Sequence, residues 1–547
     1  MNPLDIAMAY HEETKHHWHR YARSPGGLDW ANEPNPFRIF EGAPTFALPI
    51  GKRDLSPPYD DIYAADTLAP RAVSCETISE FYYLSLSIAA WKQHGEARWA
   101  LRCNPSSGNL HPTEGYLIIG PLDPISDKPA VYHYLPREHG LARRTVFSLE
   151  TWRRLSRGFP AGTFFAGLSS VYWREAWKYG ERAYRYSQMD MGHALAAYAI
   201  AATTLGWHAR WLCELSDADS ARLLGLHHPE QFTKLELEYP ELVVAVVPGP
   251  IVDPIPAQLN ADAIDCIANG DWLGRPNRLS QTHVRWDQID AVAGACCKPR
   301  TDATAFGRLT ESPAIRRPGR GNGASARTII RQRRSAVRFD CQTPLSRERF
   351  YTMMARVLPH AGRVPFDTLG PPASIHLAMF VHRVTGLEAG LYCLVRSSQH
   401  LDALRHAMRP EFVWQVPPDC PDVLPLFLLQ PGGCKTLAKR VSCHQDIAGD
   451  GAFSLGMIGE FEKPLRRFGA WYYRRLHWEA GVIGQVLYLE AEAAGIRATG
   501  MGCYFDDQMH DAFGLTGRQY QSMYHFTAGG PIEDTRLTAL PAYGATR

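Results

Sequence analysis

The chain contains two copies of one pattern, and this repeat constrains its fold more than any other feature. Each copy carries a Tyr-Arg pair followed by three glycines separated by steps of 14 and 19 residues. These residues are Tyr184, Arg185, Gly192, Gly206 and Gly225 in one copy, and Tyr473, Arg474, Gly481, Gly495 and Gly514 in the other. Solenoid repeats have only about 20–50 residues. The pattern instead predicts two homologous domains facing each other about a pseudo-twofold axis, as in a dimer fused into one chain.

The repeat divides the chain into four parts. Residues 71–257 and 326–547 are the two predicted domains, called here the first copy and the second copy. Residues 1–70, rich in His, Pro and aromatic residues, are expected to form an extended arm without a core. Residues 258–325 mix Pro, Gly and Arg and end in RRPGRGNGASAR, which is typical of a linker.

Each copy is expected to form a long buried helix around its first glycine. In the first copy this segment is rich in Ala and lacks a polar stripe, as a core helix does. Apolar segments at 115–120, 130–135 and 375–381 predict strands before the helices, and a further strand closes each copy. We therefore predict an α+β fold, with sheets covered by helices and the long helices at the domain interface.

Charge and composition exclude several classes of protein. Lys and Arg number 58 and Asp and Glu number 56, so the net charge of +2 gives no bulk field for nucleic acid or a membrane surface. No apolar run approaches the ~18 residues that span a bilayer, and the N-terminus does not resemble a secretory signal. The 12 cysteines form no C-x-x-C pair. We expect a cytoplasmic protein, compatible with a monomer, without nucleic-acid or membrane partners.

An arginine cluster opens the second copy. The segment IIRQRRSAVRFD places Arg331, Arg333, Arg334 and Arg338 around Ser335. Bidentate guanidinium groups and a hydroxyl suit a phosphate monoester; the alternative is a solvated basic face. Arg536, after the last predicted strand, adds another cation at the far end of this copy, whereas the opening of the first copy has only Arg71.

The first copy contains a polar turn that could complement this arginine-rich end, NPSSGNLHPTEG at residues 104–115. This turn carries many polar side chains before an apolar strand, whereas the matching stretch of the second copy, GPPASIH, carries few. In a face-to-face pair, the polar turn of one copy would close over the arginine-rich end of the other. The sequence therefore predicts one complete composite site and one degraded site.

These motifs resemble a known family. The Arg-Arg-Ser opening, the Pro-Ser-Ser-x-Asn turn before a strand, and the Gly-Met-Gly-Cys loop after a long helix resemble the FMN-dependent nitroreductase superfamily. The N-terminal text YHEETKHHWHRYARSPGGLDWANEPNPFRIFEGAP and the stretch WKYGERAYR look like the two-domain members of its SagB/ThcOx branch. The chain therefore resembles two tandem nitroreductase-like domains forming an intramolecular pseudo-dimer.

The resemblance implies FMN at the interface of the two copies. Arg333, Ser335 and Arg536 would hold the phosphate. The superfamily usually has a basic residue two positions after the serine; here Val337 stands there and Arg338 follows, so which arginine reaches the phosphate stays open. The residues implied along the isoalloxazine are Pro105, Ser106, Ser107 and Asn109 from the first copy, and Gly502 and Cys503 from the second.

The same resemblance implies a catalytic pair. Lys178-Tyr179 is similar to the Lys-Tyr pair thought to act in the oxidation of cyclodehydrated peptides, with Lys as a base and Tyr as a proton relay. The alternative is that Lys178 extends along apolar surface towards solvent and Tyr179 packs. The second copy has Trp471-Tyr472-Tyr473 and no Lys-Tyr pair, so its site is expected to be silent.

Three functions remain open. The first is an FMN-dependent oxidoreductase of the SagB/ThcOx type, which transfers hydride between flavin and an organic substrate such as an azoline or another modified peptide. The second is an NAD(P)H-dependent reductase of nitro compounds or quinones. Because no strand precedes the GRGNG run at 319–323, NAD(P)H would be a diffusible reductant. The third is a non-catalytic scaffold with a dead flavin site. No metal site is predicted, because His11 and His16 are five residues apart and a zinc helix needs four.

Overall fold

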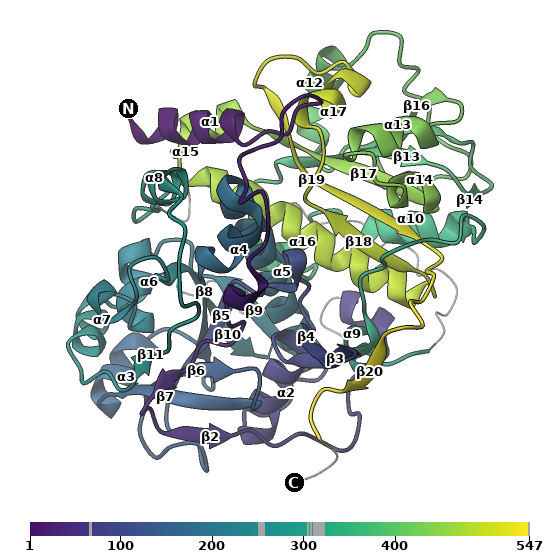
Figure 1. The fold of residues 1–547 in the computed structure, drawn as a ribbon. Helices are drawn as coiled ribbons and strands as arrows, with labels where there is room; N and C mark the ends of the chain where they lie inside the picture. Colours follow the sequence, from purple (N-terminus) through teal and green to yellow (C-terminus); the bar gives the residue numbers. More distant parts are fainter. Residues whose placement is uncertain (65–67, 250–257, 303–305, 307–308, 310–322, 545–547) are drawn as a thin grey trace.

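The computed structural model describes residues 1–64, 68–249, 258–302, 306, 309 and 323–544 (Figure 1). The GRGNG run lies outside the described residues, apart from Gly323. Within the described ranges, no helix is long and apolar enough to cross a membrane. Two antiparallel sheets, one in each copy, dominate the architecture.

The two sheets share one strand order. The first sheet contains, in order, β2 (Thr45–Ala47), β7 (Gly140–Val146), β6 (Ala130–Leu135), β5 (Thr113–Ile119), β8 (Phe164–Ser170), β10 (Tyr239–Pro248) and β9 (Trp207–Trp211). The second contains β16 (Leu426–Pro431), β15 (Gly390–Leu394), β13 (Ile375–Val381), β17 (Phe453–Glu460), β19 (Tyr520–Gly529) and β18 (Arg497–Met501). The strands predicted before the long helices are confirmed as β5, β6 and β13. Among the strands of the described ranges, only β2, which comes from the N-terminal segment, has no counterpart in the second sheet.

The long helices α5 (Ala183–Thr204) and α16 (Tyr472–Ala493) lie against each other in the middle of the molecule (Figure 1). Gly192 and Gly481 stand at this contact, 289 residues apart. A Cβ at Gly192 would overlap the carbonyl oxygen of Trp478, and a Cβ at Gly481 would overlap that of Met189. Met189 and Trp478 are also 289 residues apart. The predicted helix interface is confirmed, and the repeated glycines allow the close approach of the two backbones.

Two buried ion pairs across the interface are also reciprocal. Arg185 Nη1 lies 2.9 Å from Asp506 Oδ1, and Arg474 Nη2 lies 2.8 Å from Asp217 Oδ2. The two arginines are 289 residues apart, and so are the two aspartates. Contacts exchanged in this way are those expected across a twofold axis. We infer from them that the copies pair like the subunits of a dimer.

The second copy reaches across the first at both of its ends. β20 (Thr538–Pro541) pairs with β3 (Ile88–His94), which pairs in turn with β4 (Ala97–Arg102) (Figure 1). At the opening of the second copy, α9 (Ala326–Gln332) is capped by Ser325 and packs against α2 (Cys75–Ser85). These segments carry side chains of the second copy to the polar turn of the first.

The N-terminal segment is not the extended arm without a core that its composition predicts. α1 (Pro3–Glu13) is capped by Asn2 and buries Tyr10 and His11. His11 Nε2 lies 3.0 Å from Gln521 Oε1 of the second copy. His16 is buried, and its Nδ1 accepts a hydrogen bond from the backbone N–H of Ala22 at 2.9 Å. The expectation was wrong because these polar and aromatic side chains find partners inside the protein and not in solvent.

The predicted linker is also packed where the structure describes it. α7 (Ala261–Ala268) buries Ile264 and Ile267 against the first copy, and α8 (Asp287–Ala295) packs against α1. β11 (Arg275–Pro276) pairs with β1 (Phe40–Glu41). These elements are too short to show a clear hydrophobic period between Pro and Gly, which is why the sequence indicates a linker there. The domain boundaries themselves stay a prediction.

Candidate functional site

A cavity of about 930 Å³ lies between the two copies, within the range of about 300–1,000 Å³ typical of ligand pockets. Nine of the predicted site residues line it. They are Pro105, Ser106, Ser107, Asn109 and Tyr179 from the first copy, and Arg333, Ser335, Gly502 and Cys503 from the second. The structure therefore brings the polar turn, the arginine-rich opening and the Gly-Met-Gly-Cys loop into one place.

Two predicted phosphate ligands lie elsewhere. Arg338 is exposed, and its carbonyl oxygen accepts from the backbone N–H of Ile532. Arg536 is 77% exposed in its side chain and pairs with Asp534 at 2.7 Å. Neither lines the cavity. Both arginines were predicted to bind phosphate because of their positions along the chain. Phe339 instead pairs with Pro531 after β19, and this pairing leaves Arg338 and Arg536 on the outside.

The second copy supplies a positively charged end to the cavity. Arg331, Arg333, Arg334 and Arg497 all line it. Arg333 is buried; its Nη2 donates to the carbonyl oxygen of Arg102 at 2.9 Å, whereas its Nε has no partner among the residues that the structure describes. Burial, together with repulsion from Arg333, lowers the pKa of Arg334 to about 10. An anion would give the free Nε an acceptor and relieve this repulsion, so the residues present fit a phosphate group. Arg497 was not predicted, because it lies far along the chain on β18.

The polar turn at 104–111 is held in a strained conformation by its own side chains. Gly108, Asn109 and His111 have positive φ angles of 57°, 61° and 53°. Asn109 Nδ2 donates to the carbonyl oxygen of Ala100 at 2.8 Å, and Ser106 Oγ accepts from the backbone N–H of His111 at 2.8 Å. Some of the polar side chains that we expected to contact a ligand therefore stabilise the turn itself. Strained backbone of this kind concentrates at functional sites.

Asp190 on α5 anchors the turn and was missed by the sequence analysis. Its carboxylate accepts from the backbone N–H and the hydroxyl of Ser107, both at 3.0 Å. Burial raises the pKa of Asp190 to about 7. Glu479, 289 residues later on α16, accepts from the backbone N–H of Ser374 at 2.9 Å, just before β13. An acid at the same place in both long helices was the signal that could have found it.

Lys178 and Tyr179 end the helix α4 (Tyr172–Tyr179) beside the turn. A Cβ at Gly108 would lie 2.6 Å from Tyr179 Oη and 3.1 Å from Lys178 Nζ, so both polar ends reach this glycine. Tyr179 packs edge-on against Tyr186, with ring centroids 4.6 Å apart. Burial raises the pKa of Tyr179 well above its ordinary value, so the phenol is protonated at neutral pH. Tyr179 both packs and lines the cavity, whereas Lys178 is half-buried behind it.

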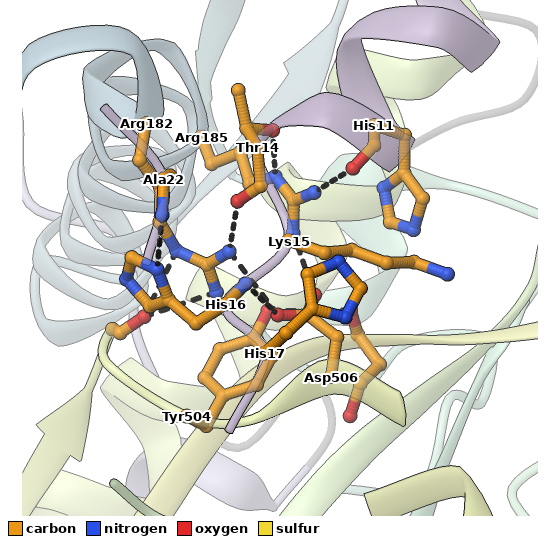
Figure 2. A network of polar contacts seen from close by, with 12 residues as sticks. His11, Thr14, Lys15, His16, His17, Ala22, Arg182, Arg185, Tyr504 and Asp506 are labelled. Atoms are coloured by element: carbon orange, nitrogen blue, oxygen red, sulfur yellow. Dashed lines mark hydrogen bonds and ion pairs between the residues drawn. The ribbon is translucent and has the colours of Figure 1, made fainter. Parts of the chain in front are cut away.

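The wall formed by Gly502 and Cys503 is supported by the network in Figure 2. Arg182 donates to the carbonyl oxygen of Gly502 through Nε at 3.3 Å and Nη2 at 3.2 Å, and to that of Thr14 at 2.5 Å. Asp506 pairs with Arg182 at 3.2 Å and with Arg185 at 2.9 Å. Although burial opposes ionisation, the two arginines hold the pKa of Asp506 well below its usual range. The N-terminal segment thus takes part in positioning a cavity wall.

Comparison with known proteins identifies the region that carries the polar turn. Residues 92–235 match the Nitroreductase family. Over 108 residues the chain is 29% identical to MJ1384 of Methanocaldococcus jannaschii, a protein named as a nitroreductase; the match covers 19% of this chain and 52% of that relative. A crystal structure from Anabaena variabilis, titled as a nitroreductase, aligns over 96% of this chain and 99% of its own with a TM-score of 0.67. Because the two sequences are only 19% identical, this likeness shows a shared fold and no more.

The region that matches the Nitroreductase family contains Lys178-Tyr179, and the second copy has no equivalent pair. The offset of 289 residues that relates the two long helices places Arg467-Phe468, at the end of α15 (Glu462–Phe468), opposite Lys178-Tyr179. The equivalent of Lys178-Tyr179 is therefore Arg467-Phe468 and not part of Trp471-Tyr472-Tyr473, as the sequence suggested. The two copies still differ as expected, because phenylalanine has no hydroxyl to exchange a proton.

The region where a second cavity would lie is filled. Trp211 stands 289 residues before Gly500, which lines the cavity. The Trp211 ring lies 6.3 Å from the rings of Trp471 and Phe306, and all three side chains are buried. Lys298 Nζ lies over the Trp471 ring at 5.2 Å. Aromatic side chains therefore fill the position of the first copy that matches the cavity wall at Gly500.

Proposed function

We propose that the chain is an FMN-dependent oxidoreductase of the SagB/ThcOx type, acting at one interdomain cavity on a small-molecule or modified-peptide substrate. The observation that carries this proposal is an arginine-rich end and Tyr179 in the same cavity, with Lys178 beside Tyr179. The family match of the first copy and the fold shared with the Anabaena structure support it. Bound FMN would supply two-electron redox chemistry, and the chain would supply binding, orientation and proton control.

Arg333, Arg334 and Arg497 are the proposed phosphate ligands. Arg333 carries most of the argument, because its Nε is buried without an acceptor. Ser335 Oγ lies 3.0 Å from Tyr488 Oη, which accepts from the backbone N–H of Gly500 at 2.9 Å. This chain of bonds fixes Ser335 relative to the cavity wall. Pro105, Ser106, Ser107 and Asn109 would flank the ring from the opposite copy, with Gly502 and Cys503 along its other edge.

Tyr179 and Lys178 are proposed to control the proton. Tyr179 Oη is the group of the pair that lines the cavity, and burial keeps it protonated. Glu175, one turn earlier in α4, is buried. Burial and repulsion from Asp190 raise the pKa of Glu175 well above its ordinary value, which favours the neutral carboxyl. The Lys178 ammonium is then available to stabilise a phenolate when Tyr179 gives up its proton.

The first experiment measures flavin per chain. The full-length protein is purified, denatured, and its released flavin quantified, before and after incubation with excess FMN. We expect one FMN per chain, and for R333A about tenfold weaker FMN binding or more, since charge-assisted bonds to a phosphate are strong. R338A, which changes an exposed arginine, is the matched control and should bind like the wild type. A folded chain that does not bind FMN contradicts the proposal and favours the scaffold hypothesis.

A second candidate is NAD(P)H-dependent reduction of nitro compounds or quinones; the name of the similar protein from Methanocaldococcus jannaschii supports the nitro compounds. Rapid bleaching of the FMN-loaded protein by NAD(P)H would support this reading. Indifference to NAD(P)H, with turnover of an azoline substrate that Y179F abolishes, would support the SagB/ThcOx assignment.

A further inference from the structure

Two thiols meet at the cavity wall, on segments that are far apart in the sequence. Cys503 lines the cavity. The backbone N–H of Phe505 donates to the carbonyl oxygen of Val441 at 2.9 Å, and Gln445 Nε2 donates to that of Cys503 at 2.8 Å. These two bonds hold the turn 441–445 alongside the wall, and Cys443 lies between them in sequence.

Cys443 stands in a turn with an unusual backbone. Cys443 and His444 have positive φ angles of 52° and 59°, which few residues other than glycine adopt. Cys443 and Cys503 are both free and half-buried. Because the two backbone contacts join the turn to the wall on either side of Cys443, the two cysteines lie on neighbouring segments at the edge of the cavity.

The surroundings make the two thiols chemically unequal. Interaction with Cys443, and then with the Arg182 guanidinium, lowers the pKa of Cys503 against the effects of burial and Asp506. The same interaction, with burial, raises the pKa of Cys443. An easily ionised, accessible thiol beside a second thiol is the arrangement found in redox-active cysteine pairs.

We propose that Cys503 and Cys443 form a redox-active dithiol in the cavity wall, which hydrogen peroxide oxidises reversibly to a disulfide. The Cys503 thiolate attacks one peroxide oxygen, the O–O bond breaks, and protonation releases water and leaves a sulfenic acid. The Cys443 thiol then attacks this sulfur, the S–S bond forms, and a second water leaves. Two thiols and one peroxide thus give one disulfide and two waters, with two electrons passing to the peroxide. A dithiol reductant reverses the change.

The disulfide would tie the turn 441–445 to the wall. Gln445 and Cys503 both line the cavity, so the bond would fix part of its lining. This site goes beyond the proposed function and does not depend on bound FMN.

The test treats the full-length protein, flavin-free and FMN-loaded, with hydrogen peroxide, followed by alkylation and mass spectrometry. We expect a Cys443–Cys503 cross-link, with a loss of about 2 Da that dithiothreitol restores. In C443S, Cys503 should accumulate a sulfenic acid that dimedone traps. In C503S no cross-link should form at Cys443. C341S, which removes an exposed thiol elsewhere, should cross-link like the wild type.

Rates give a second measurement. We expect Cys503 in the wild type to react at least about tenfold faster with peroxide than Cys341, because Cys443 and Arg182 favour its thiolate. Reaction no faster than that of Cys341, or a wild-type peptide map with no Cys443–Cys503 cross-link, overturns the proposal. If a serine variant fails to fold by circular dichroism, the wild-type map alone decides. The flavin-free sample separates this outcome from a failure of FMN binding.

Discussion

Gly108 shows how one residue connects the polar turn to the proposed proton donor. Its φ of +57° is unfavourable for alanine by about 1–2 kcal/mol, and a Cβ there would come within 2.6 Å of Tyr179 Oη. We expect G108A to be destabilised and to lose most substrate turnover, because Tyr179 and Lys178 must move. G95A is a matched control, since Gly95 has the same φ but open space around its Cβ. Thermal unfolding and turnover of both variants separate strain from displacement; equal turnover in the two would contradict this role.

Asp190 makes the stability of the protein depend on pH in an identifiable direction. Its pKa is about 7 in the folded protein and about 4 when unfolded, so the folded state binds this proton more tightly. The contribution of Asp190 to the free energy of unfolding is therefore greatest below about pH 4 and falls as pH rises to about 7, by at most about 1.4 kcal/mol per unit.

D190N should lack this part of the slope, because its amide cannot ionise and its oxygen still accepts from Ser107. Urea unfolding of both proteins at pH 5, 6, 7 and 8 measures the difference. D127N, which changes an exposed carboxylate, should follow the wild type. Parallel slopes for D190N and the wild type would show that Asp190 is ionised throughout.

At the level of elements, the start of α17 (Asp506–Phe513) joins α5 to the N-terminal segment. D506N would leave Arg182 and Arg185 buried without a carboxylate, so we expect a loss of about 3–5 kcal/mol in the free energy of unfolding. D217N is the matched control, because Arg474 keeps Glu241 at 3.2 Å and should lose less. The pKa of Asp506 is depressed, so its stabilisation is present at neutral pH and is lost only as the pH falls below about 4. Denaturant unfolding at pH 7 compares the variants; equal losses would contradict this account of the network.

Across the whole molecule, the two copies should unfold together. The α5–α16 contact, the two reciprocal ion pairs and the β20–β3 pairing all join one copy to the other. We expect tryptophan fluorescence and far-ultraviolet circular dichroism to report one coincident denaturant transition. Two separated transitions would show that the copies are independently stable.

The sequence predicts the repeated parts of this molecule best. Glycine spacing identified the helix contact because a close approach of two backbones requires glycine at both Gly192 and Gly481. The polar turn and Arg333 were recognised because their residue types are unusual together. Arg497 and Asp190 were missed because their roles depend on which strand or helix lies opposite. The N-terminal segment was misread because His11 and His16 resemble solvated residues until their partners, hundreds of residues away in the case of Gln521, are known.

Trp211 has a consequence for how such a chain can evolve. In a dimer of identical subunits, one mutation from glycine to tryptophan at this position would block both sites at once and abolish function. Once the two genes are joined, each half accumulates changes separately, and a bulky residue can be selected in one half for the packing it provides. A mutation then no longer changes both sites at once. One half is free to become a rigid support, while the other keeps small residues along its cavity.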